Sequence, residues 1–295
     1  MSSIVTTVRH GSTPSTTAQH PLPTLHNRTR RSASIPLSLL RRGRLLDLPI
    51  YALLRLSDLA REGLDHSGSF RFADHIYRSE PSGRGPIGRW LDARLLALPA
   101  TQSFRFRYLA ARDELVAFVE QRHASRPLDV LSVPCGIPRE LAEAAARLRE
   151  RGVPLDGVRF HGLDLDSAAL HAAETFAQQH GLAPFTAHRG DALDRASYPA
   201  RVDVITCTGL AEFLEDDEFT HLLGVFYDVL APGGVLVTSG MRRRRFSDYL
   251  LQLAEMPTHY RTAEDLLRLA QGWPFRTVST RTDPNGIQTM LKAQK

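Results

Sequence analysis

The sequence predicts an α/β fold: a helical amino-terminal region, then a mostly parallel sheet that ends in an antiparallel hairpin. After residue 127, short apolar runs and helical segments alternate five times, which is typical of a parallel sheet covered on both faces. Before residue 127, leucines recur at helical spacing without strand signals. Near the end, Asp-Pro-Asn-Gly at 283–286 separates two strand-like runs, a strong hairpin-turn signal.

The amino-terminal region divides into two predicted parts. Residues 1–34 are rich in Ser, Thr, Pro and His with few apolar residues, so we expect a disordered basic tail; an organelle transit peptide is the alternative. Residues 35–126 are predicted to form a helical cap. Its expected segments are a helix or helix pair at 38–60, a Gly- and Pro-rich loop at 77–88, and helices at 89–100 and 104–123. For 38–60, packing on its own domain is favoured over docking to a membrane surface.

Residues 127–295 are predicted to form one sheet domain. The expected strands are 128–133, 158–166, 184–191, 202–208 and 231–240, followed by a hairpin of 275–282 and 286–293. The expected helices are 138–152, 167–181, 217–230, 246–255 and 262–270. Thr262 and Asp265 have the spacing of a capping pair at the start of the last helix.

Composition narrows the class of protein. The chain has 295 residues, 42% apolar and 23% charged, as expected for a soluble globular protein, and no apolar run approaches the ~18 residues of a transmembrane helix. The two cysteines are too few for a disulfide framework, which favours a cytoplasmic location. The net charge of +5 comes from arginine without an aromatic-interleaved basic patch, so we expect no nucleic-acid partner. None of the 12 histidines has a metal-ligand spacing. Oligomeric state is left open.

The predicted ligand edge lies beyond the carboxyl ends of the strands, where open α/β sheets bind their ligands. Asp164 ends the second strand about twenty-eight residues after Gly136, and a carboxylate there can accept both hydroxyls of a ribose. Asp166 directly precedes a helix and suits its N-cap. Asp191 follows the third strand, where it can accept an exocyclic amine of a base; a simple turn aspartate is the alternative.

Five motifs carry a family resemblance: VLSVPCGIP, GLDLD, RGDAL, ITCTGLAEFL and VLAPGGVLVTSG. From Leu128 to Lys295 the chain resembles the class I S-adenosylmethionine-dependent methyltransferases. The resemblance implies a seven-stranded Rossmann-like sheet, an enzyme, and S-adenosylmethionine bound across the strand ends without a metal. It also implies cofactor contacts from Pro134, Cys135, Gly136, Asp164, Leu165, Asp191 and Ala192, with Thr208 and Gly209 lining the substrate side.

The first motif departs from the family. Ser132 stands where an acid is usual, and Pro134 and Pro138 stand where glycines are usual. Pro138 suits the first turn of a helix, whereas Pro134 removes a donor and stiffens the turn. We therefore expect the methionine end of the cofactor to be held differently. With only Gly136 left for close approach, a dinucleotide is disfavoured. Cys135 is expected to fill space under the loop rather than act as a nucleophile.

The reaction itself has three candidate interpretations. Methyl transfer to a small-molecule acceptor is favoured, because it is the majority chemistry of the family. The alternative is attack by the cofactor's own amine on its γ-carbon, forming azetidine-2-carboxylate and methylthioadenosine; Tyr77, Tyr198 and Ser239 are candidates to stabilise the neutral amine. In the loop at 77–88, Tyr77 could face the sulfonium and Arg84 could grip a carboxylate. A non-catalytic cofactor-binding protein is the third interpretation.

Overall fold

The computed structural model describes residues 34–66, 68–123, 125–182 and 184–295, apart from the side chains of residues 246 and 247. The chain divides into two compact units. The sheet unit holds Phe106–Arg242 and His259–Lys295, and the helical unit holds Arg243–Thr258 with the described part of Pro23–Arg105. The units therefore divide at 105/106, whereas the sequence places a domain boundary at 126/127. The predicted basic tail lies almost entirely outside the described residues.

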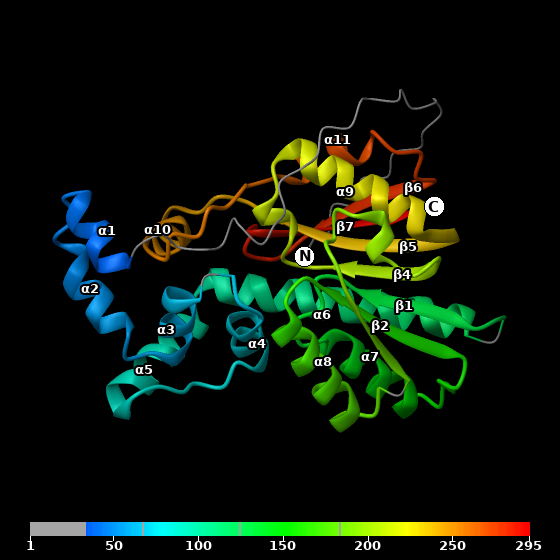
Figure 1. Cartoon of the computed structure of the whole chain (residues 1–295), viewed down its shortest axis with the longest axis horizontal. Helices are drawn as coiled ribbons and strands as arrows, with labels where there is room; N and C mark the ends of the chain where they lie inside the picture. Colours follow the sequence, from blue (N-terminus) through cyan, green and yellow to red (C-terminus); the bar gives the residue numbers. More distant parts are fainter. Residues whose placement is uncertain (1–33, 67, 124, 183) are drawn as a thin grey trace. The chain divides into compact units, whose positions relative to one another are not determined.

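The sheet unit contains a seven-stranded sheet in the order β3-β2-β1-β4-β5-β7-β6 (Figure 1). Its strands are β1 Leu128–Ser132, β2 Val158–Asp164, β3 Phe185–Arg189, β4 Val202–Cys207, β5 Leu230–Met241, β6 Thr277–Thr282 and β7 Gln288–Gln294. The pairs among the first five strands are parallel, and β7 runs antiparallel to both β5 and β6. The predicted fold, including the closing hairpin, is confirmed.

The strand order reverses between β1 and β4, which places the topological switch point there. Ser132, the last residue of β1, pairs with Gly162 of β2 and with Thr206 of β4. The carboxyl ends of these three strands are therefore level at one edge of the sheet. Open α/β sheets bind ligands at such a point.

Helices cover both faces of this sheet. They are α6 Pro99–Arg122 from residue 106 onward, α7 Arg139–Glu150, α8 Ser167–Gln179, α9 Asp216–Val229 and α11 Ala263–Ala270. Figure 1 shows α6, α7 and α8 on one face and α9 and α11 on the other. On the first face, Leu115 of α6 and Leu141 of α7 share a buried apolar cluster with Val130, Val204 and Val237 of the strands. The central strands β1, β4 and β5 bury both faces because each face is covered, which explains their nearly continuous apolar runs.

Helix starts follow the predicted capping residues. The side chain of Asp166 accepts a hydrogen bond from the backbone N–H of Ala168 at 2.8 Å, as the N-cap of α8. Thr262 and Asp265 form the predicted capping box of α11. Pro138 lies immediately before α7 rather than inside its first turn. Within the described ranges, no helix is long and apolar enough to cross a membrane.

The helical unit consists of short helices. They are α1 Ile35–Arg41, α2 Asp47–Leu54, α3 Asp58–Asp65, α4 Phe70–Arg78, α5 Gly85–Leu96, the start of α6, and α10 Arg245–Leu253. The loop expected at 77–88 is shorter than predicted, because Tyr77 belongs to α4 and α5 already begins at Gly85. Ser69 caps α4 by accepting a hydrogen bond from the N–H of Phe72 at 3.1 Å. The Gly and Pro residues of this stretch therefore mark a helix start as well as a loop.

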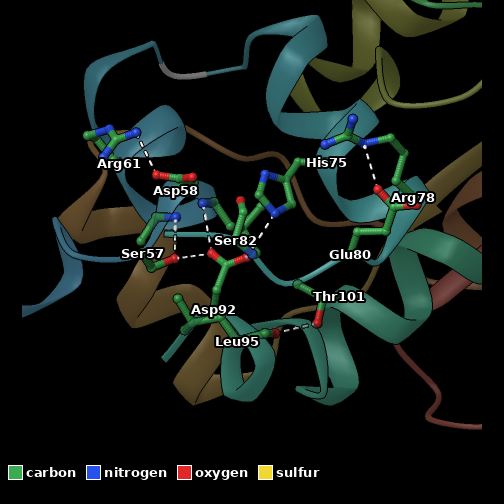
Figure 2. Close-up of polar contacts among 12 residues, drawn as sticks. Ser57, Asp58, Arg61, His75, Arg78, Glu80, Ser82, Asp92, Leu95 and Thr101 are labelled. Atoms are coloured by element: carbon green, nitrogen blue, oxygen red, sulfur yellow. Dashed lines mark hydrogen bonds and ion pairs between the residues drawn. The ribbon is translucent and has the colours of Figure 1, made fainter. Parts of the chain in front are cut away.

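Asp92 of α5 connects several of these helices (Figure 2). Its carboxylate is fully buried and accepts hydrogen bonds from the backbone N–H groups of Leu59 and Ser82, both at 2.9 Å. It also bonds His75 Nε2 at 2.9 Å and the hydroxyl of Ser57. Burial by itself raises the pKa of Asp92, but these hydrogen bonds outweigh it and hold the pKa below its usual value. The carboxylate thus fastens α3, α4 and the loop after α4 to α5.

We predict that Asp92→Asn lowers the free energy of unfolding by about 2–4 kcal/mol, because it leaves buried donors without their charged acceptor. Folding lowers the pKa of Asp92, so the ionised group stabilises the fold above its unfolded pKa. That stability is lost as the pH falls through the lowered folded pKa. The variant should therefore lose less stability than the parent chain on acidification. Urea unfolding at neutral and acidic pH measures both effects.

The matched control is Asp65→Asn in the same unit. Asp65 pairs with Arg55 at 2.5 Å with about a third of each side chain exposed, and such surface pairs contribute about 0–1 kcal/mol. Equal losses in the two variants would contradict the role given to Asp92.

Candidate functional site

The first loop, between β1 and α7, is held by backbone hydrogen bonds. The N–H of Cys135 bonds the carbonyl oxygen of Leu163 at 2.9 Å. The N–H of Gly136 bonds Asp164 Oδ2 at 3.0 Å. Gly136 has a φ of 45°, a left-handed conformation that glycine adopts without steric cost. The Val133–Pro134 bond is cis. Pro134 has no N–H to donate, yet the loop is fastened to the end of β2 by the N–H groups of Cys135 and Gly136.

Asp164 joins three strand ends. Besides the N–H of Gly136, its carboxylate accepts the N–H of Asp166 at 3.0 Å. Its backbone oxygen accepts the N–H of Gly190, which follows β3, at 3.1 Å. Asp164 is 9% exposed, and burial raises its pKa although the N–H donors lower it. A carboxylate has about four acceptor sites, so two accepted bonds leave room for the hydroxyls of a ribose. The residues present fit a nucleoside.

The loop after β3 carries Asp191 and Ala192. Asp191 is half-buried, and its carboxylate accepts the N–H of Leu193 at 2.9 Å, the geometry of a turn aspartate. Tyr198 is buried and its hydroxyl donates to the carbonyl oxygen of Ala192 at 2.6 Å. Burial raises the pKa of Tyr198 well above its usual value. Tyr198 therefore holds the backbone of the loop after β3, and a role toward an amine would require this bond to break.

Cys135 packs beneath the loop. It is buried in an apolar cluster with Leu170 and Ala173 of α8. A Cβ on the neighbouring Gly162 would lie 2.9 Å from its Sγ atom, so the thiol fills the space that this glycine leaves. Burial raises the pKa of Cys135 well above its usual value. This environment favours the filler interpretation, because nucleophilic cysteines have lowered pKa values.

Sequence reasoning missed Glu140. It lies in the first turn of α7, is buried, and its Oε1 accepts a hydrogen bond from Ser132 Oγ at 2.5 Å. Thr206 Oγ1 lies 3.4 Å from the same oxygen. Burial raises the pKa of Glu140 despite these hydrogen bonds. A carboxylate thus reaches the end of β1 from α7, although β1 itself carries serine there. The sequence has serine at position 132, where an acid is usual in the family that it resembles. That departure could have prompted a search for an acid elsewhere near this loop, such as Glu140.

A second carboxylate, Glu212, was also missed. It follows β4 in the short helix η3 Ala211–Phe213, and is buried with Arg107 of α6 and Gln288 of β7. Glu212 Oε1 accepts Arg107 Nη1 at 3.2 Å and lies 3.5 Å from Gln288 Nε2. Glu212 Oε2 and Gln288 Oε1 have no hydrogen-bond partner among the described residues. Buried acceptors without donors are rare and need an explanation.

Ser239 belongs to the same region. Its hydroxyl is fully buried without a hydrogen-bond partner in the described part of the chain. Val237 and Met290 face the α6–α7 core, and side chains two residues apart share a face of a strand. Ser239 and Gln288 therefore lie on that same face. We call Arg107, Glu212, Ser239 and Gln288 the buried polar cluster.

The buried polar cluster adjoins the loop after β4 that holds Thr208 and Gly209. Gly209 has a φ of 93°, and a Cβ there would lie 2.7 Å from Arg107 Nη2. Glycine thus allows the guanidinium to lie against the backbone. Thr208 beside it is half-buried. The residues that the resemblance assigns to the substrate side therefore lie next to Arg107.

The remaining predicted residues are located as follows. Leu165 is half-buried at the turn after Asp164. Tyr77 and Arg84 belong to the helical unit, where Tyr77 packs against an apolar cluster around Ile76 and Arg84 is exposed at the start of α5. Their roles toward a cofactor stay predictions. Among the described residues, no three His, Cys, Asp or Glu side chains gather as a metal site.

Comparisons with known proteins agree with this geometry. Residues 131–236 match a family model described as a methyltransferase domain. No curated protein sequence matches the chain. The structure of a possible exported protein from Bordetella parapertussis is 24% identical and covers 92% of this chain and 95% of its own, with a TM-score of 0.69. Magnesium protoporphyrin IX methyltransferase from Synechocystis PCC 6803, with bound S-adenosylhomocysteine, is 14% identical and covers 81% and 100%, with a TM-score of 0.52.

At these identities the solved structures establish the fold, which is that of the class I methyltransferases. The matched segment, 131–236, contains Gly136, Asp164 and Asp191 of the predicted ligand edge and Glu212 of the buried polar cluster. The fold and the family match together support a class I methyltransferase-fold enzyme.

Proposed function

We propose that the protein transfers a methyl group from S-adenosylmethionine to a small-molecule acceptor with a hydroxyl or an amine. The observation that carries this proposal is the bond between Asp164 at the end of β2 and the N–H of Gly136 in the first loop. It lies within the segment that matches a methyltransferase domain. This hydrogen bond holds a carboxylate next to a glycine in the left-handed conformation. Both residues lie beside the topological switch point, where a nucleoside could contact them.

The adenosine part would be held by the β2 and β3 ends. Asp164 would accept the ribose hydroxyls through its remaining acceptor sites, and Asp191 would accept the exocyclic amine of adenine. Leu165 and Ala192 would supply the flanking contacts. Gly136, with no side chain, would allow the backbone to approach the cofactor. When bound, S-adenosylmethionine supplies an electrophilic methyl group on a sulfonium.

Glu140 is proposed to hold the ammonium of the methionine end. It is a buried carboxylate beside the first loop, and it contacts the hydroxyls of Ser132 and Thr206, which are both neutral. A buried carboxylate is stabilised by a cation, which favours its ionised form. Glu140 would thereby take the place of the acid that is usual at position 132. This contact would hold the methionine end of the cofactor although Pro134 has no N–H to donate.

Glu212 is proposed to take the proton of the acceptor. Arg107 binds one carboxylate oxygen and fixes the side chain. The other oxygen, Oε2, is buried without a donor among the described residues, so it can accept an O–H or N–H group. Ser239 Oγ and Gln288 Oε1 are likewise buried without a hydrogen-bond partner among the described residues, and they would be further acceptors for the substrate. A proton acceptor beside the substrate-side loop favours methyl transfer to a separate molecule over attack by the cofactor's own amine.

The products distinguish the three interpretations. The purified chain is incubated with S-adenosylmethionine, first alone and then with a set of small alcohols, phenols and amines. We expect S-adenosylhomocysteine only when an acceptor is present. Methylthioadenosine formed without an acceptor would establish the azetidine-forming reaction instead. Binding without turnover across the set would favour a non-catalytic binding protein.

We predict that Asp164→Ala weakens binding of both S-adenosylmethionine and methylthioadenosine roughly 10- to 100-fold, because charged hydrogen bonds to the ribose are lost. Isothermal titration measures both affinities. Asp166→Ala is the matched control, since it removes an N-cap and should lower the free energy of unfolding by about 1 kcal/mol without changing either affinity. Unchanged nucleoside binding by the Asp164 variant would refute the placement of the cofactor.

We predict that Glu140→Gln weakens S-adenosylmethionine roughly 10-fold while methylthioadenosine binds as before, because only the former carries the ammonium. Titration of both ligands against the same protein measures the difference. Ser132→Ala, which removes a neutral partner of Glu140, is the control and should change neither affinity much. Equal weakening of both ligands by Glu140→Gln would assign Glu140 to loop structure instead.

We predict that Glu212→Gln lowers the rate of methyl transfer by about 10²- to 10⁴-fold, the usual contribution of a general base, while cofactor affinity stays unchanged. The rate is followed by S-adenosylhomocysteine formation with an acceptor found above. Asp217→Asn changes an exposed acid on the neighbouring helix α9 and should leave the rate unchanged. A full rate in the Glu212 variant would exclude it as the base.

A further inference from the structure

The exposed large apolar side chains are unevenly distributed. Eight such residues occur among those described, and all belong to the helical unit. Two of them, Ile87 and Trp90, lie on α5. The other six define what we call the α1–α2 surface: Leu37, Leu40, Leu45, Leu46, Ile50 and Leu53. Single exposed apolar residues are normal, but a concentration of them marks an interaction site.

The α2 part of this surface is a regular stripe. Leu46, Ile50 and Leu53 follow i, i+4, i+7 spacing and therefore share one side of the helix; they are 87%, 40% and 50% exposed. Leu48, Tyr51 and Leu54 of the same helix pack against α1 and α10. A helix that is apolar on both its packed and its exposed side needs a second partner.

Basic residues lie among these leucines. Arg41 and Arg42 are exposed at the end of α1, and Arg44 follows in the turn before α2. Two acids lie nearby: Asp47 binds Arg44 Nε at 2.5 Å, and Glu255 accepts the hydroxyl of Ser38 and lies 3.8 Å from Arg42 Nη2. With three arginines and two acids, the α1–α2 surface combines an apolar stripe with a small excess of positive charge, and Arg41 and Arg42 are exposed.

We propose that the α1–α2 surface binds an anionic phospholipid bilayer, with α1 and α2 lying in its interface. Leucine and isoleucine side chains would enter the acyl boundary, and the arginines beside them would reach the phosphates, because long basic side chains extend their charged ends to the headgroups. A protein partner fits less well, since protein hot spots favour Trp, Tyr and Arg and are poor in leucine. This inference is independent of the proposed methyl transfer, and it concerns docking on a membrane rather than crossing one.

Vesicle sedimentation of the full chain tests the proposal. The probes are vesicles of phosphatidylcholine alone and vesicles that also contain phosphatidylglycerol. We expect binding to the anionic vesicles, with less binding at high salt because ionic contacts are screened. Leu46→Glu with Leu53→Glu should abolish it. Arg41→Gln with Arg42→Gln should weaken it roughly 30-fold, at the usual contribution of a basic residue near an anionic surface.

The matched control is Ile87→Glu, which changes an equally exposed apolar side chain on α5 and should leave binding intact. Thermal unfolding of every variant checks that the exposed substitutions preserve the fold. Equal binding to neutral vesicles, or binding that survives the leucine changes, would overturn the proposal. So would a dimer in light scattering that the same leucine changes dissociate, because a second copy would then be the partner.

Discussion

The candidate cofactor site depends on one buried carboxylate, that of Asp164. It accepts the N–H of Gly136 from the first loop and the N–H of Asp166 at the start of α8, while its backbone oxygen holds Gly190 after β3. Three strand ends thus share one residue. A charge with so little exposure is tolerated because several donors converge on it. The same hydrogen bonds hold the first loop next to the acid that is proposed to bind the ribose.

Two further buried acids, Glu140 and Glu212, lie on the α6–α7 side of the sheet. Glu140 meets the hydroxyls at the ends of β1 and β4, and Glu212 meets Arg107 beyond β4. Where the apolar core ends, the strand ends therefore carry polar side chains. Glu212 Oε2, Ser239 Oγ and Gln288 Oε1 lack partners in the described structure, and each such group costs stability. Functional sites are where such costs are tolerated, because a ligand can supply the missing donors.

The helical unit uses similar chemistry for a structural purpose. Asp92 gathers donors from α3, α4 and the following loop and is fully satisfied by them. This contrast with the buried polar cluster is informative. A satisfied buried carboxylate organises short helices that have little apolar core of their own, whereas a partly satisfied one points to a ligand. The α1–α2 surface adds the third case, apolar side chains that the described part of the fold leaves uncovered.

The sequence by itself determined the order of elements, the parallel sheet with its hairpin, the caps at Asp166 and Thr262, and the acids after β2 and β3. These follow from local patterns: periodicity, capping residues and turn signals act over a few residues. Only the tertiary structure decided that Glu140 reaches Ser132 from α7 and that Tyr198 donates to Ala192. It also decided that Arg107 lies against Gly209 and binds Glu212, which is 105 residues further along the chain. Some of these contacts join residues far apart in the chain, and the others depend on how a strand end meets the helix or loop that follows it. Periodicity, caps and turn signals encode neither kind of contact.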